Sequence, residues 1–230
     1  MMNLIEWDQT IGSIIQISLL LIFLAALLWK HKQLGRGIIC FIAGNILITT
    51  TNIVIFIIHQ TGIVFHTKAL YSICVNFGSF LILFIYFHKV LRQYWSKVIN
   101  VISMVCLVIG YSLFVYFETD FFNRLPVGFF LFEVVLLMTN IFLVLRETFN
   151  SDKILYIRTY YPFWACIGLM AIYLGITPLM VIGDSSTRII NVNIFFLLLF
   201  IVNMLGYAIL LIGIFDAEGK NSQRRGSYRN

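Results

Sequence analysis

Seven long apolar stretches fill almost the whole of this 230-residue sequence. A helix needs about 20 residues to cross a hydrocarbon core about 30 Å thick, and every stretch is close to that length or longer. The polar segments between them are short, so no separate soluble domain fits between two stretches. The stretches cover residues 11–29, 38–58, 69–87, 98–117, 127–145, 159–182 and 189–214.

The composition agrees with a protein that is surrounded by lipid. Hydrophobic residues make up 60% of the chain and charged residues 11%, whereas soluble domains have about 25% charged residues. We therefore expect an all-α, polytopic membrane protein whose main partner is the lipid bilayer. Its single seven-helix transmembrane domain covers residues 1–215, and a short basic cytoplasmic tail covers 216–230.

The first stretch is expected to remain in the protein as a helix. The ten residues before it contain Glu6 and Asp8 but no lysine or arginine, so the positive region of a signal peptide is missing. Lys30, His31 and Lys32 follow it, in place of a small-residue cleavage site.

The basic residues predict the orientation in the membrane. If the N-terminus lies outside, the cytoplasmic segments hold 13 of the 16 lysines and arginines, and the outer segments hold Lys68, Arg124 and Arg188. This distribution follows the positive-inside rule and predicts an N-out, C-in bundle, with Trp29 and Trp95 at the inner membrane boundary. We expect the cytoplasmic (inner) membrane of a bacterium. The net charge of +6 then reflects topology and attraction to anionic headgroups, and we expect no nucleic-acid partner.

No metal, cofactor or catalytic site is expected. The four cysteines lie in four different stretches, without metal-ligand spacing, and are interpreted as small packing residues. His59 and His66 are seven residues apart near the predicted outer face, but no carboxylate or third histidine accompanies them.

Polar residues inside the stretches predict which helix faces meet in the interior, because lipid offers a polar side chain no partner. Several recur at helical spacing in the second, third, fifth and seventh stretches, and a polar seam or ligand pocket shared by these four is one interpretation. Interhelical hydrogen bonding that only holds the helices together is the other. The candidates are Asn45, Thr49, Asn52, Asn76, Glu133, Asn140, Asn193, Asn203 and Tyr207, with Ser72 and Ser79 on the face of Asn76.

Glu133 is the only ionisable side chain well inside any stretch. An acid at the centre of a membrane helix costs about 2.5–3.5 kcal/mol on insertion scales, and somewhat less nearer the edge. Burial there favours a protonated, hydrogen-bonded carboxyl group. A proton- or cation-linked switch, an anchor for a polar ligand, and an interhelical clamp are the three roles that this residue suggests.

Prolines in the sixth stretch predict an irregular helix. Pro162 opens the stretch and Pro178 lies near its end, so we expect a bent or unwound outer third.

Short motifs in the sixth and seventh stretches resemble a bacterial membrane module. The residues are Tyr161-Pro162-Phe163-Trp164, the segment 168–173, and the asparagine-containing segment 191–207. They resemble a seven-helix module of Bacteroidetes that occurs alone or as the membrane portion of sensor histidine kinases, and Glu133 falls where that module carries an acidic or polar residue. The resemblance covers nearly the whole chain. It implies a sensory or accessory membrane protein, with no catalytic residues to carry over.

Residues 216–230 leave no place for the phosphoacceptor helix and ATP-binding domain of a kinase. We therefore expect a non-enzymatic sensory, receptor-like or accessory module that signals through a separate membrane or cytoplasmic partner, contacted by the basic inner loops. The alternative is a small solute transporter of three-plus-one-plus-three repeat type, in which Asn76 and Asn193 would occupy matching helices. Against it, the first three stretches contain no proline to act as a hinge. An intramembrane enzyme is disfavoured, because the stretches offer one acid and no central histidine.

Overall fold

A computed structural model describes residues 9–62, 66–118, 121–122, 126–184 and 192–217. In that part of the chain the regular elements are all helical, and seven crossings are long and apolar enough to span a membrane, which confirms the predicted fold class. Each crossing extends past its predicted stretch at one end or both. The elements are α1 (Gln9–Lys30), α2 (Ile38–Thr61), α3 (Thr67–Tyr71), η1 (Ser72–Gly78), α4 (Ser79–Val90), α5 (Tyr94–Phe117), α6 (Val127–Phe149), η2 (Asp152–Thr159), α7 (Tyr161–Asp184) and α8 (Val192–Asp216).

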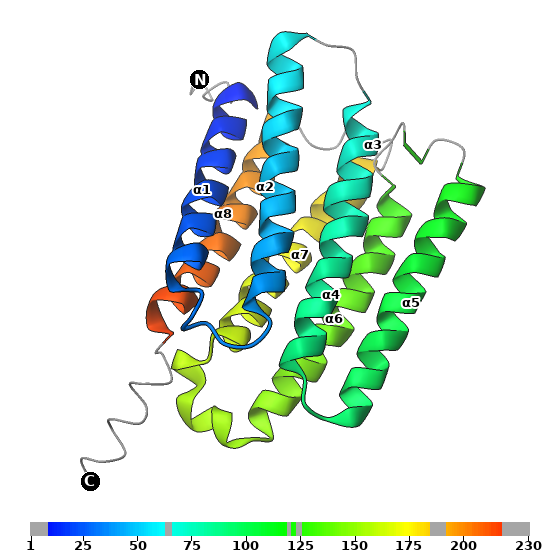
Figure 1. The fold of residues 1–230 in the computed structure, drawn as a ribbon. Coiled ribbons are helices and arrows are strands. Elements are labelled where there is room, and N and C mark those ends of the chain that lie inside the picture. Colours follow the sequence, from blue (N-terminus) through cyan, green and yellow to red (C-terminus); the bar gives the residue numbers. More distant parts are fainter. Residues whose placement is uncertain (1–8, 63–65, 119–120, 123–125, 185–191, 218–230) are drawn as a thin grey trace.

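The helices form two layers, which the chain fills in opposite directions (Figure 1). The first layer contains α1, α2, the third crossing (α3, η1 and α4) and α5, and the second layer returns through α6, α7 and α8. Across the layers, α6 packs on α4 and α5, and α8 lies beside α1. The Lys30 ammonium at the end of α1 donates a 3.0 Å hydrogen bond to the carbonyl of Phe215 near the end of α8. The first and last helices therefore close the bundle.

The outward faces of the bundle are apolar. Ile22 of α1, Ile109 of α5, and Val135 and Phe142 of α6 are each more than half exposed. Such a continuous apolar surface is unfavourable in water and suits hydrocarbon. Trp29 and Trp95 are 75% and 74% exposed, as expected of aromatic rings at a membrane boundary.

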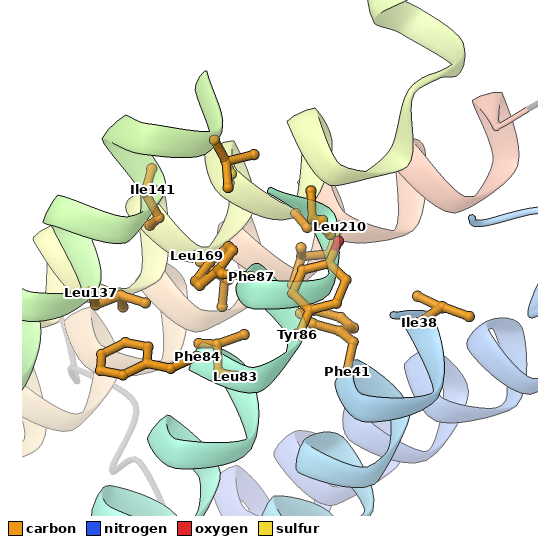
Figure 2. Close-up of a cluster of buried hydrophobic side chains, with 14 of the residues drawn as sticks. Ile38, Phe41, Leu83, Phe84, Tyr86, Phe87, Leu137, Ile141, Leu169 and Leu210 are labelled. Carbon is orange, nitrogen blue, oxygen red and sulfur yellow. The ribbon is translucent and has the colours of Figure 1, made fainter. Parts of the chain in front are cut away.

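A cluster of buried aromatic and aliphatic side chains joins five helices (Figure 2). It contains Ile38 and Phe41 of α2, Leu83, Phe84, Tyr86 and Phe87 of α4, Leu137 and Ile141 of α6, Leu169 of α7 and Leu210 of α8. The Phe41 ring centroid lies 5.0 Å from that of Tyr86 and 5.9 Å from that of Tyr161. One phenylalanine thus links α2, α4 and α7.

Glycines bring α7 and α8 into close contact. Four glycines of these helices are each covered by a larger side chain of the other helix: Trp164 covers Gly213, Leu210 covers Gly168, Ile172 covers Gly206 and Val202 covers Gly175. A Cβ atom added at Gly168 or at Gly206 would lie 3.2 Å from the carbonyl oxygen of the other. Small residues at such positions let membrane helices approach closely enough for dispersion forces to hold them together.

The third crossing contains a helical irregularity that the sequence does not predict. The seven residues of η1 form a π-helix, an uncommon geometry that is frequent at functional sites. For the sixth crossing the sequence predicts a bent or unwound outer third. Unwinding is not found, because α7 continues without interruption from Tyr161 to Asp184 with Pro178 inside it, and a bend stays a prediction. Pro178 leaves the Leu174 carbonyl without its backbone donor, and the Thr177 hydroxyl donates to the neighbouring Tyr173 carbonyl at 2.6 Å.

Three connections lie at one end of the bundle, which we call the basic end. They join α1 to α2, α4 to α5 and α6 to α7, and α8 finishes at the same end (Figure 1). The α1–α2 connection turns at Gly35 and Gly37, whose φ angles of 94° and 81° suit glycine. The sequence predicts that this end faces the cytoplasm, and the orientation stays a prediction.

Candidate functional site

Three polar side chains lie seven residues apart on the buried face of α6. Glu133 and Asn140 are completely buried, and Glu147 is 6% exposed. Seven residues advance an α-helix by about 10.5 Å, so the three groups occupy three levels of the bundle. Their surroundings differ at each level.

Glu133 has no hydrogen-bond partner for either carboxylate oxygen among the described residues. It lies on α6 one turn after Phe129 and Phe130, which are also buried. A buried polar group without a partner is uncommon in native proteins, and it usually indicates a bound water molecule, an ion or a functional role. Glu133 is therefore the strongest candidate among the predicted site residues.

Three tyrosines from three other helices lie within electrostatic range of the carboxylate. They are Tyr71 of α3, Tyr111 of α5 and Tyr173 of α7. The Tyr111 ring stacks on Phe77 of η1, with centroids 4.4 Å apart. No spacing in the sequence connects these tyrosines, because each belongs to a different helix, and sequence analysis did not identify them.

Asn140, at the middle level, belongs to a hydrogen-bond cluster that joins three helices. The Asn100 amide of α5 donates to Asn140 Oδ1 at 2.7 Å and to the Phe84 carbonyl of α4 at 3.2 Å. The His88 Nδ1–H group donates to Asn100 Oδ1 at 3.2 Å, and the Asn140 amide donates to the Leu136 carbonyl at 2.8 Å. Asn140 is thus an interhelical clamp, and its main partner, Asn100, was missed because it stands near the start of its predicted stretch.

Replacing Asn100 with alanine is expected to lower the free energy of unfolding by about 1–2 kcal/mol, since it removes three bonds of this cluster. The matched control is Ser112→Ala on the same helix, because the exposed Ser112 hydroxyl bonds only to the Val108 carbonyl of its own helix. Denaturation in mixed micelles measures both variants. Equal losses of stability in the two variants would show that the cluster does not stabilise the packing of α4, α5 and α6.

Glu147, at the basic end, binds backbone amides. Its carboxylate accepts hydrogen bonds from the amide nitrogens of Arg92 at 2.8 Å and Gln93 at 3.1 Å. Gln93 immediately precedes α5. Glu147 therefore fixes the connection between α4 and α5 and stabilises the start of α5. Sequence analysis missed it because the predicted stretch ended at Leu145.

Four of the predicted interior residues bond within their own helices. Asn45 donates to the Phe41 carbonyl, Thr49 to Asn45, Asn52 to Ile48 and Asn203 to Leu199, each four residues back and at 2.7–2.9 Å. The Ser79 hydroxyl likewise donates to the Val75 carbonyl. These bonds satisfy the side-chain donors without joining two helices, so the described residues show no continuous interhelical seam through them.

A small cavity lies beside two of the predicted residues. Asn45 and Tyr207 line it together with Ser79 and Tyr173, and its volume is about 50 Å³. A water molecule needs about 10–15 Å³ of such volume, whereas pockets for organic ligands have about 300–1,000 Å³. Glu133 does not line this cavity.

The remaining predicted residues are placed as follows. Asn76 is buried within η1, and the Tyr207 ring packs edge-on against Phe23 of α1, with centroids 5.3 Å apart. The Asn193 side chain lies outside the described residues. Over the described ranges, no three histidine, cysteine or acidic side chains gather as metal ligands.

No family model matches this chain, and comparisons with curated proteins and with solved structures find no significant match. The fold therefore provides the classification: seven apolar helices packed in one bundle indicate an integral membrane protein.

Proposed function

We propose that this protein is a non-enzymatic sensory or accessory module of a bacterial cytoplasmic membrane, which responds to protonation of Glu133 and passes the response to a separate partner protein. The observation that carries the proposal is the fully buried Glu133 carboxylate without a hydrogen-bond partner in the described chain. The resemblance to the Bacteroidetes membrane module supports a sensory or accessory role.

A proton fits these surroundings better than an organic ligand. The cavity of about 50 Å³ that Asn45 and Tyr207 line has room for a few water molecules only. The same volume offers no solute-sized site beside the predicted residues, so no observation favours the transporter alternative. Tyr71, Tyr111 and Tyr173 are the titratable groups within electrostatic range of Glu133, and in the described part of the chain no lysine, arginine or histidine offsets its charge. Gain or loss of one proton therefore changes the net charge of this interior region.

The α6 helix offers a physical route from Glu133 to the basic end. Glu133 and Glu147 share its buried face about 21 Å apart, the length of fourteen helical residues. Glu147 holds the α4–α5 connection through two backbone amides. A change in how α6 packs around a charged or neutral Glu133 would therefore reach a connection that a partner can contact. Two helix packings biased by one proton are sufficient for such a switch.

The test compares Glu133→Gln with Glu118→Gln, which changes an exposed residue just after α5. The full chain is reconstituted in vesicles, and pH-difference infrared spectra are recorded in the carboxyl stretching region. The wild type and Glu118→Gln are expected to show a buried carboxyl band that Glu133→Gln lacks. Backbone hydrogen exchange over Thr67–Val90, corrected for the intrinsic pH effect, should depend on pH in the wild type and in Glu118→Gln, but not in Glu133→Gln. Identical spectra and exchange in both variants would refute the proton-linked role.

The partner is tested separately by cross-linking in native membranes. A sensory or accessory module is expected to give the same cross-linked protein repeatedly, in an amount that changes between wild type and Glu133→Gln. Absence of any cross-linked protein would contradict signalling through a partner, even if Glu133 titrates.

A further inference from the structure

A large pocket opens at the basic end of the bundle, far from Glu133. It has a volume of about 890 Å³ and lies between the α1–α2 connection, the α4–α5 connection and the segment that joins α6 to α7. These three connections lie together in Figure 1, at the end where the described chain finishes. The volume is within the range of sites that bind organic ligands.

The pocket lining is strongly cationic. Six basic residues line it and Asp152 is the single acidic one; the basic residues are Lys32, Arg36, Lys89, Arg92, Lys97 and Lys153. Glu147 lies next to Arg92, but its carboxylate is engaged by two backbone amides. Within the described ranges, no ion pair is recorded for any of the six cations.

The cations crowd one another. Burial, together with the Arg92 guanidinium, lowers the pKa of Lys153 below its ordinary value, and the Glu147 carboxylate acts in the opposite direction. The Lys153 ammonium donates a 2.9 Å hydrogen bond to the Tyr160 hydroxyl and lies 4.5 Å from the centroid of that ring. The neutral Tyr160 side chain therefore holds the Lys153 ammonium in the pocket without balancing its charge. A bound anion would balance that charge.

Membrane topology alone does not explain this arrangement. The positive-inside rule accounts for basic residues at one end of the bundle, but not for their convergence on one concave site. Arg146 and Arg158 lie at the same end and do not line the pocket. The tail, residues 218–230, contributes four basic residues and one acidic residue, so its charge does not complement the pocket either.

We propose that this pocket binds a phosphate-bearing anion, either the headgroup of an anionic lipid or a soluble phosphate compound. Two guanidinium groups, Arg36 and Arg92, supply the planar forks that bind phosphate oxygens in pairs, and the lysines supply additional positive charge. The membrane boundary gives both kinds of ligand access to the site. The inference is independent of the proton-linked role of Glu133.

The test uses the full chain, with inorganic pyrophosphate as the soluble probe and phosphatidic acid as the lipid probe. Calorimetry in detergent measures pyrophosphate binding. Native mass spectrometry, after reconstitution in phosphatidylcholine nanodiscs with and without phosphatidic acid, measures the lipid that the protein retains. The pocket variant is Arg36→Gln with Arg92→Gln, and the control that removes the same charge is Arg146→Gln with Arg158→Gln.

The wild type is expected to bind at least one probe, more weakly as the salt concentration rises. The pocket variant should raise the dissociation constant, or lower lipid retention, by roughly tenfold or more. The control should stay within about twofold of wild type, as exposed charges usually do. Pyrophosphate binding alone identifies a soluble ligand, and lipid retention alone identifies a headgroup.

Two results would overturn the proposal: no binding of either probe to the wild type, or equal losses in the pocket and control variants. If the pocket variant melts below wild type without a probe, Lys32→Gln with Lys97→Gln takes its place. These two side chains line the pocket and make no recorded hydrogen bond within the described residues.

Discussion

Valine in place of Gly206 is expected to separate α7 from α8 and to lower the free energy of unfolding by about 3 kcal/mol or more. The reason is geometric. A Cβ atom at this position would enter the space of the Ile172 side chain and approach the Gly168 carbonyl oxygen to 3.2 Å. The α7–α8 contact has little room to adjust, because Gly168, Gly175 and Gly213 are covered in the same manner. Denaturation of the purified protein in mixed micelles measures the loss.

The control for Gly206→Val is Ala208→Val, two residues further along α8 and exposed. It adds two methyl groups on the lipid-facing side and should change stability by less than about 0.5 kcal/mol. A rescue variant sharpens the test: Ile172→Ala removes the side chain that meets the new Cβ, so Gly206→Ala should cost less in that background. Full stability of Gly206→Val would contradict the observed packing.

Substitution of Glu147 with alanine should lower the free energy of unfolding by about 3 kcal/mol, because two backbone amides just before α5 lose a charged hydrogen-bond acceptor. Glu147→Gln keeps one amide oxygen as an acceptor and should cost about half as much. The same denaturation assay, together with hydrogen exchange of residues 91–97, locates the loss. Glu118→Ala serves as the control, since Glu118 is exposed. If Glu147→Ala and Glu118→Ala lower the free energy of unfolding by the same amount, the hydrogen bonds from Arg92 and Gln93 to Glu147 do not stabilise the fold.

The sequence predicted the seven crossings because hydrophobic length is a local property. Each helix forms where an apolar stretch is long enough to satisfy its own backbone hydrogen bonds in lipid, and no distant residue is needed for that. The predicted ends were less accurate. The fifth stretch was ended at Leu145 although α6 continues to Phe149, because Arg146 and Glu147 are polar.

The candidate site was predicted only in part, because partners depend on how neighbouring helices are rotated. The seven-residue spacing between Glu133 and Asn140 correctly placed both on one buried face of α6. The spacing could not show that Asn140 binds Asn100 while the Glu133 carboxylate has no hydrogen-bond partner among the described residues. The sequence did not predict the basic pocket either, since its cations come from three connections and from the helix ends beside them, which meet only in the folded bundle.

The π-helical segment Ser72–Gly78 gives the third crossing room for one residue more than an α-helix would hold. A π-helix closes each hydrogen-bonded ring one residue later than an α-helix does. Deletion of a single residue here would therefore let the segment close as an ordinary α-helix, with Tyr71 and the residues before it close to their present orientation. The same deletion inside a purely α-helical crossing would turn every residue on one side of it by about 100° about the axis. The third crossing can thus shorten by one residue and keep Tyr71 on the same side of the bundle.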